Sequence, residues 1–247
     1  MKIFFAALFV LCLFIISVCA QQASNPPGDF TAPSESIRES SPNDQDRPPR
    51  EHRVLKQGPL APSANDQLAY ASFLRDRDTG LIRLLPRELH RNRMQAKIPD
   101  GGAYYSFADL THVYGYSDLQ LAQNTLSVGF NGANYGMLIN FGDVLLADIT
   151  LKDPRVRFMA DYHVPKRESV ARFEYKSFQQ GLTVDGGFYR SRLPVTVNAT
   201  YGLRSINYGH SDVLVAFRVV RKDPDGSIII LWKLLKHYPD PGLKQGK

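Results

Sequence analysis

The chain has 247 residues and a net charge of +6, and hydrophobic residues make up 43% of it. This composition is typical of a globular protein and excludes a wholly disordered chain, a collagen or a coiled coil. The two cysteines, Cys12 and Cys19, are too few for a disulfide-rich scaffold.

The first twenty residues predict a secretory signal peptide, residues 1–20. Lys2 provides a positive start, an uncharged apolar run covers Ile3–Val18, and Ala20 is a small residue before the expected cleavage. A membrane anchor is the alternative, but the run is short for a span of about 20 apolar residues. No later segment is apolar enough to cross a membrane, so we expect no transmembrane segment after cleavage.

Both cysteines lie in the predicted signal, so the mature chain has no thiol for a disulfide, a nucleophile or a zinc–thiolate site. Exported eukaryotic proteins usually carry disulfides. The sequence therefore favours a secreted or periplasmic protein of bacterial type.

Residues 21–65 predict a disordered, proline-rich linker. Eight of the 16 prolines fall in this segment, and Phe30 is its one aromatic residue. Such a segment buries too little apolar surface to offset the loss of chain entropy. We expect one globular domain over residues 66–240 and a flexible tail over 241–247.

The start of this domain predicts a helical lead-in. Asp66 is a candidate cap for a short helix that reaches Leu74 and ends near Gly80. The apolar run Leu81–Leu85 follows and ends at Pro86, with several arginines around it.

From about Ala103 onward, short apolar and aromatic runs alternate with turn residues, which predicts strands. Ser169–Gln180 instead has helical spacing and ends near Gly181. We expect a mainly β, single antiparallel domain, a sandwich or a partly closed barrel with one or two short helices. The candidate strands are 103–107, 113–116, 126–130, 137–141, 156–164, 193–197 and 201–208.

The clearest local prediction is a hairpin around Asp223–Gly226. Pro224 cannot adopt a positive φ, so a type I turn followed by Gly226 in the left-handed bulge position fits best. Asp223 then faces Ser227, and Arg218 faces Trp232. We expect Trp232, which has apolar neighbours, to lie in the core.

Three stretches resemble a known group of proteins: Thr79–Glu88, Gly101–Phe107 and Ser211–Lys236. They are similar to an uncharacterised group of secreted bacterial β-rich proteins, over about residues 78–238. The resemblance implies export and a single β-rich body. That group has no known activity, so no functional residue is transferred.

Candidate catalytic residues are few. The triplet Asp78–Gly80 matches aspartic proteases, but no second copy exists to share a proton. His210 and Asp212 are two residues apart and would share one face of a strand, where both could point at a metal. Further aspartate and histidine residues that a hydrolase or metal site could use are Asp109, His112, Asp161 and His163. No metal ligand set is assigned.

The most unusual segment is Ile98–Leu151, which contains no lysine or arginine and has five aspartates and five tyrosines. A central sheet would exclude cations in the same way. The functional alternative is a tyrosine-lined face for a neutral ligand such as a glycan, or for Ca²⁺. The candidate ligand-binding residues are Tyr104, Tyr114 and Tyr116.

These observations favour an exported, non-enzymatic binding or envelope-associated module over an enzyme. Its expected partner is a cell-envelope polysaccharide, with no specific nucleic acid because no nucleic-acid motif or dense basic run is present. The alternative is a secreted hydrolase with Asp/His pairs, with or without a metal. Clustering of His112, His163 and His210 in one cleft would favour the hydrolase.

Overall fold

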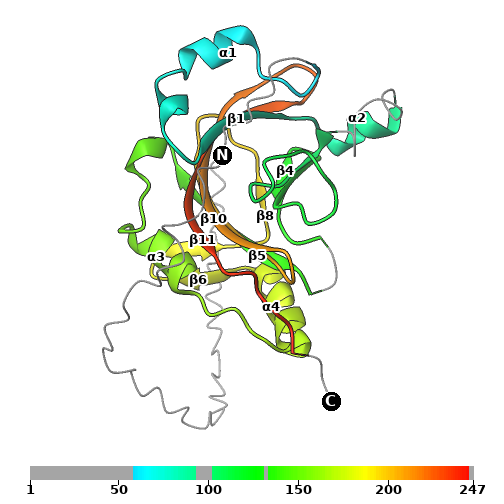
Figure 1. Cartoon of the computed structure of the whole chain (residues 1–247), viewed down its shortest axis with the longest axis vertical. Helices are drawn as coiled ribbons and strands as arrows, with labels where there is room; N and C mark the ends of the chain where they lie inside the picture. Colours follow the sequence, from blue (N-terminus) through cyan, green and yellow to red (C-terminus); the bar gives the residue numbers. More distant parts are fainter. Residues whose placement is uncertain (1–57, 93–101, 131–132, 245–247) are drawn as a thin grey trace, which may run out of the picture. The chain divides into compact units, whose positions relative to one another are not determined.

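The computed structural model describes residues 58–92, 102–130 and 133–244 (Figure 1). The predicted signal peptide and residues 21–57 of the predicted linker lie outside the described residues. No helix in the described part has both the length and the apolar character that crossing a membrane requires.

The larger of the two main sheets has five antiparallel strands in the order β1-β11-β10-β9-β5. Its centre is the hairpin β10–β11, and every neighbouring pair is antiparallel. The strands are β1 (Thr79–Leu84), β5 (Tyr135–Gly142), β9 (Thr200–Asn207), β10 (Ser211–Lys222) and β11 (Ile228–Tyr238).

The smaller sheet has four short antiparallel strands in the order β2-β3-β4-β8. Gln123 and Asn124 join β3 to β4 with positive φ angles of 48° and 58°, as a two-residue type I′ hairpin turn requires. The strands are β2 (Tyr104–Tyr105), β3 (Leu119–Ala122), β4 (Thr125–Ser127) and β8 (Arg192–Pro194). A separate hairpin pairs β6 (Leu182–Val184) with β7 (Gly187–Tyr189).

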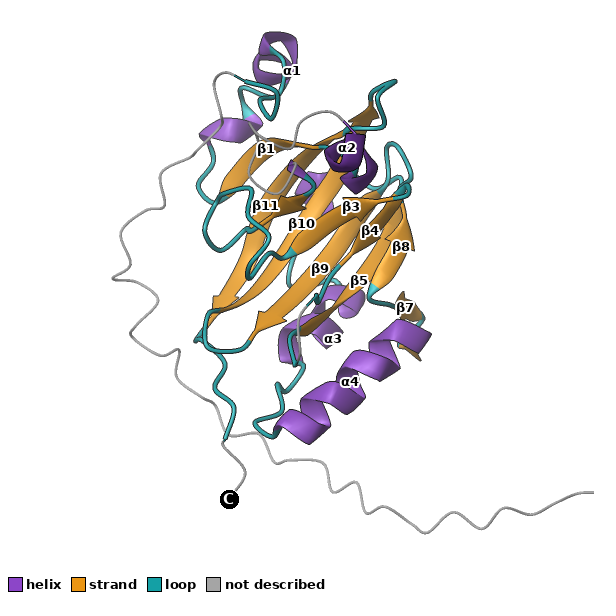
Figure 2. Ribbon diagram, turned by 90° about the vertical axis from the view of Figure 1, so that its right-hand side faces the viewer, coloured by secondary structure: helices purple, strands orange, loops and turns teal. Residues whose placement is uncertain are grey.

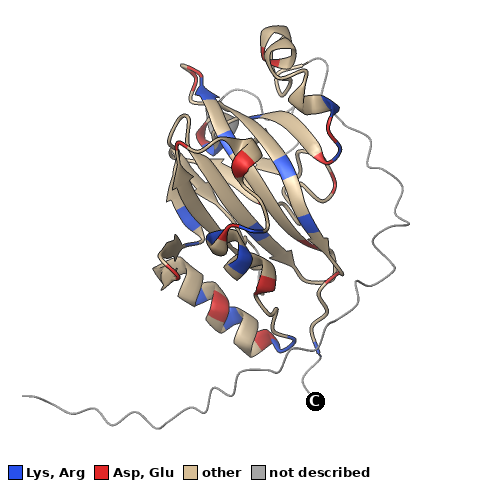
Figure 3. Cartoon of the chain, turned by 90° about the vertical axis from the view of Figure 1, so that its left-hand side faces the viewer, with Lys and Arg blue, Asp and Glu red and all other residues tan. Residues whose placement is uncertain are grey.

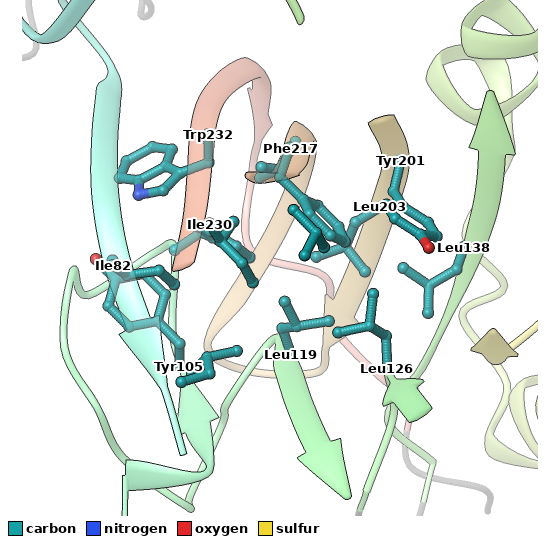
Figure 4. Packing of buried hydrophobic residues seen from close by; sticks show 14 of the residues in the cluster. Ile82, Tyr105, Leu119, Leu126, Leu138, Tyr201, Leu203, Phe217, Ile230 and Trp232 are labelled. Carbon is teal, nitrogen blue, oxygen red and sulfur yellow. The ribbon is translucent and has the colours of Figure 1, made fainter. Parts of the chain in front are cut away.

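The two main sheets pack face to face around one apolar core (Figure 2). In Figure 4, Leu119 and Leu126 from the small sheet point toward Leu203, Phe217 and Ile230 of the large one. Strand alternation produces this arrangement, because every second residue of a strand faces the same side.

Backbone hydrogen bonds link the two sheets on both sides. Leu138 of β5 exchanges two hydrogen bonds with Arg190, and the amide of Leu85, just after β1, donates to the carbonyl of Gly102, just before β2. The mainly β, antiparallel fold expected from the sequence is therefore confirmed, as a sandwich that is partly closed at its edges.

Helices cover the other face of the large sheet. The main ones are α3 (Pro154–Asp161) and α4 (Glu168–Gln180), which pack on a second apolar cluster. Because both of its faces are covered, β9 is buried at all eight positions. Acidic and basic residues alternate along the outside of α4 (Figure 3), with Glu168 paired to Arg172 at 2.6 Å.

Two predicted strands are wrong. Residues 156–164 form most of α3 and the loop after it, because the Asp153 side chain caps the first turn and Pro154 occupies its first position. Residues 113–116 form a loop, in which Tyr116 has a φ of 56° that a strand does not tolerate. The helix predicted over 169–180 is confirmed as α4 and ends at Gly181.

The helical lead-in is correct only at its start. The first helix is α1 (Ala64–Ala69), where Ser63 is the cap and Asp66 completes a capping box from the third position. After the short 3₁₀ helix η2 (Phe73–Arg75), residues 79–84 form edge strand β1, so Gly80 lies in a strand and does not end a helix. The remaining short helices are α2 (Arg87–Asn92) and η4 (Leu146–Asp148).

Residues just outside both predicted ends of the domain form hydrogen bonds with it. The carbonyl of Pro59 accepts a hydrogen bond from Arg83 at 3.3 Å, so part of the predicted linker contacts β1. The carbonyl of Pro241 accepts from Gly209, and the amide of Lys244 donates to Lys166. The first residues of the expected flexible tail are therefore hydrogen-bonded to the domain.

The predicted hairpin is present, but its register shifts by one residue. Asp223 and Ser227 are hydrogen-bonded at 2.8 Å, and Gly226 has a φ of 84°, as predicted. An irregularity between Val219 and Arg221 then moves the pairing, so Trp232 faces Phe217 and not Arg218. Trp232 is 4% exposed, which confirms its place in the core.

Candidate functional site

Four side chains form a continuous row across the outer face of the small sheet. Tyr104 pairs with Gln120, Gln120 with Ser127, and Ser127 with Arg192. Their neighbours Tyr105, Leu119, Leu126 and Leu193 face or pack against the core, so this row lies on the opposite face of the sheet. On that face Tyr104, Gln120 and Ser127 are buried and Arg192 is exposed. We call Tyr104, Gln120, Ser127 and Arg192 the outer row.

A groove of about 380 Å³ runs over this face. Its floor comes from β3, β4 and the turn between them, and its sides include the start of α2 and Arg192 of β8. The lining residues, which we call the outer groove, are Arg87, Glu88, Gln120, Ala122, Gln123, Thr125, Ser127 and Arg192.

Hydrogen bonds hold the outer groove in place. The side-chain amide of Gln120 donates to the hydroxyl of Tyr104 at 2.6 Å. The carboxylate of Glu88 accepts from the backbone amide of Gln123 with both oxygens at 3.1 Å, which ties α2 to the β3–β4 turn. These hydrogen bonds fix the positions of Gln120 and Glu88 among the groove residues.

Three aromatic side chains pack together beside the outer groove. The Tyr104 ring, next to Gln120 in the sheet, meets the edge of Tyr114 with ring centroids 4.9 Å apart and also packs against Phe130 at 5.7 Å. Tyr104 is 5% exposed, whereas Tyr114 is 43% exposed. Two of the three predicted binding tyrosines thus lie together, and Tyr114 is the more exposed of the two.

Tyr116, the third predicted tyrosine, belongs to a different site. Its ring stacks on His210 at 4.5 Å, and His210 Nε2 lies 2.9 Å from Asp109 Oδ2. The hydroxyl of Ser106 donates to the same carboxylate oxygen at 2.9 Å. We call Ser106, Asp109, Tyr116 and His210 the end cluster.

A buried carboxylate, Asp118, lies close to the end cluster. It accepts hydrogen bonds from the backbone amides of Phe107 and Ala108 and from the side-chain amide of Asn207 at 2.7, 3.2 and 3.0 Å. Burial raises the pKa of Asp118 to about 6, against the hydrogen bonds that favour its charged form. Sequence reasoning counted Asp118 only as one aspartate among several, because nothing local marks a buried carboxylate.

Of the predicted catalytic residues, Asp109 contacts His210, whereas Asp212 does not. Asp212 lies on the helix-covered side of β10, where it forms a buried ion pair with Arg204 at 2.9 Å. His210 belongs to the turn before β10, so strand alternation does not bring it and Asp212 to one face. Within the described residues, no group of three or more His, Cys, Asp or Glu side chains could hold a metal ion.

The remaining histidines are also separate. His112 contacts the carbonyl of Arg83 at 2.9 Å, and burial lowers the pKa of its imidazole. His163 lines another cleft, of about 580 Å³, together with Asp161, Tyr162 and Tyr238. The three histidines therefore lie in three different environments.

Arg87 and Arg192 are the groove residues that sequence reasoning missed. Both lie outside the cation-free segment Ile98–Leu151, yet they line the same groove as Gln120 and Ser127 from that segment. The alternation of apolar and polar residues in 119–121 and 126–127 signals an outward polar face, but the pairing with β8 is not local information.

Searches against protein-family models, curated proteins and solved structures found no match to this chain.

Proposed function

We propose that the protein is an exported, non-enzymatic binding module that holds a glycan in the outer groove. The observation that carries this proposal is the outer row, in which an aromatic ring, an amide, a hydroxyl and a guanidinium follow one another across four paired strands. Neighbouring strands are about 4.8 Å apart, so three steps span about 14 Å. This length suits a short oligosaccharide lying across the strands.

The chemistry of the outer groove fits a sugar. Sugar hydroxyls both donate and accept hydrogen bonds, and the groove lining includes two side-chain amides, two hydroxyls and two guanidinium groups. The half-exposed ring of Tyr114, beside Tyr104, offers a flat apolar surface for the C–H face of a sugar. With the predicted signal peptide, these features support a cell-envelope polysaccharide as partner.

A blocking variant tests the site. Thr125 lines the outer groove, and a strand position tolerates tryptophan, so Thr125→Trp fills the groove while keeping the fold. Thr183→Trp, at an exposed position of β6, is the matched control. In affinity gels containing soluble polysaccharides, we expect Thr125→Trp to weaken binding at least about tenfold and Thr183→Trp to leave it unchanged.

If the gels retard Thr125→Trp as strongly as the native protein, the ligand binds outside the outer groove. Failure of the native protein to bind any polysaccharide in the panel would remove the glycan proposal. Thermal melting of each variant checks that both remain folded.

One observation favours a second candidate, a hydrolase centred on the end cluster. The contact between His210 and Asp109 orients the imidazole, whose other nitrogen could take a proton from water. If this site is catalytic, the protein releases reducing ends from an oligosaccharide and His210→Ala abolishes that release without changing the melting temperature. His112, His163 and His210 have different partners and do not share one cleft, which favours the binding module first.

A further inference from the structure

We infer that the ligand of the outer groove carries a carboxylate, as an acidic sugar does, and that Arg192 and Arg87 recognise it. This inference rests on the proposed glycan-binding function and specifies its ligand. It starts from the two guanidinium groups that line the groove.

Arg192 differs from the other strand arginines. Arg83, Arg204, Arg218 and Arg221 each form an ion pair with an aspartate. In the described part of the chain, Arg192 has neither an ion pair nor a hydrogen bond to another side chain. The fold thus gives a carboxylate partner to four strand arginines and leaves the fifth facing the groove.

Arg87 contributes a second cation from another element. It lies at the start of α2 and lines the same groove as Arg192. Among the described residues it also lacks a carboxylate partner. Two exposed arginines that face one groove repel each other weakly, and an anionic ligand between them removes that repulsion.

The single acidic residue of the outer groove does not cancel this charge. Glu88 faces the amide of Gln123 with both of its oxygens, so its role is to position the turn. With two arginines and one glutamate among its lining residues, the groove carries a net positive charge.

A carboxylate matches this arrangement better than a long polyanion does. The planar guanidinium fork of arginine binds a carboxylate with two parallel hydrogen bonds. The rest of the outer row, Tyr104, Gln120 and Ser127, is uncharged. A nucleic-acid surface would instead offer many cations along the phosphate backbone.

A carboxylate-bearing ligand differs from the neutral ligand that the sequence predicts. That expectation came from the absence of lysine and arginine in Ile98–Leu151. Strand pairing brings Arg192 opposite Ser127, so the surface that this segment forms is not free of cations.

The test compares two probes that have the same sugar chain, one with free carboxylates and one with methyl-esterified carboxylates. Oligogalacturonate and its fully methyl-esterified form are titrated into the purified protein by calorimetry, with the native chain, Arg192→Gln, Arg192→Lys and the control Arg190→Gln. Arg190 is exposed, donates to the carbonyl of Gln179 and does not line the outer groove.

We expect the native protein to bind oligogalacturonate about tenfold more tightly than the methyl ester, and Arg192→Gln to abolish that difference in affinity. Arg192→Lys should retain part of it, because the charge remains without the fork. Arg190→Gln should behave as the native protein.

Equal affinity for acid and ester, with both lost in Thr125→Trp, would overturn the carboxylate inference and leave the glycan-binding function intact. Absence of binding to either probe or to any neutral glycan would overturn both. Binding to DNA with steep salt dependence, and not to the acid, would identify phosphate as the ligand and overturn the inference.

Discussion

Gly80 and Trp232 face each other across β1 and β11, and the indole occupies the space that a side chain at position 80 would need. A Cβ atom built on Gly80 would lie 2.6 Å from three indole atoms. The indole nitrogen of Trp232 is buried without a hydrogen-bond partner in the described residues. Local sequence could not show this contact, and Gly80 was therefore interpreted as the end of a helix.

Gly80→Ala should lower the free energy of unfolding by about 1–3 kcal/mol, because the added methyl group overpacks the contact with Trp232. Gly115→Ala is the matched control, since a Cβ there meets no atom within 4 Å. Urea unfolding measures both. An unchanged midpoint for Gly80→Ala would contradict the packing described for β1.

Asp118 predicts a specific dependence of stability on pH. Its pKa is about 6 in the folded chain and 3.8 in the reference state, so the folded chain holds the proton more tightly. Stability from this group is therefore present below pH 4 and is lost as the pH rises to about 6. The two pKa values differ by about two units, which corresponds to roughly 3 kcal/mol.

Asp118→Asn isolates this contribution. His112, whose pKa is lowered by burial, adds stability as the pH rises through its unfolded value, and this effect remains in the variant. Asp109 and His210 of the end cluster also remain. We expect the native curve to lose stability relative to the variant between pH 4 and pH 6, and parallel curves would show that folding does not raise the pKa of Asp118.

At the scale of elements, the buried ion pair Arg204–Asp212 connects the large sheet to the end of α3. Arg204 of β9 donates to both oxygens of Asp212 of β10 and to the carbonyl of Tyr162 after α3. The ring of Tyr238 covers the guanidinium at 3.9 Å. Three elements and the end of β11 therefore meet at one buried charge.

Asp212→Asn should cost about 3–5 kcal/mol, because it leaves the Arg204 charge buried without its counter-ion. Asp143→Asn removes the partner of Arg218 at the surface, where Asp143 is 77% exposed, and should cost less than about 1 kcal/mol. Denaturant unfolding of both variants makes the comparison. Equal losses would mean that the buried pair does not carry this stability.

Elements whose signals lie in the local sequence were predicted. Features that depend on pairing with residues far along the chain were not. The spacing of apolar residues in α4 and the turn residues of the β10–β11 hairpin are local signals, and both were correct. The irregularity near Val219 and the pairing of Ser127 with Arg192 depend on tertiary packing. The contact of Tyr104 with Tyr114 followed from their membership of one tyrosine-rich segment, whereas Arg192 came from a distant strand.

At the scale of the whole molecule, the contacts of Pro59, Ser63 and Asp66 extend the folded unit to the N-terminal side of the predicted boundary. Asp66 is 7% exposed and pairs with Arg221 of β10. Brief digestion with proteinase K should therefore leave a fragment that retains Gly58–Asn65, as identified by mass. A fragment that begins beyond Asp66 would contradict the docking of this segment.

If the molecule is a glycan-binding module, a bound oligosaccharide lies along the outer row. The most direct measurement is an NMR titration of the isotope-labelled protein with oligogalacturonate, in which each backbone amide reports its own environment. We predict shifts centred on Gln120, Ser127 and Arg192, with no comparable change at Asp109 or His210. Shifts confined to the end cluster or to α4, with the outer row unaffected, would contradict the account.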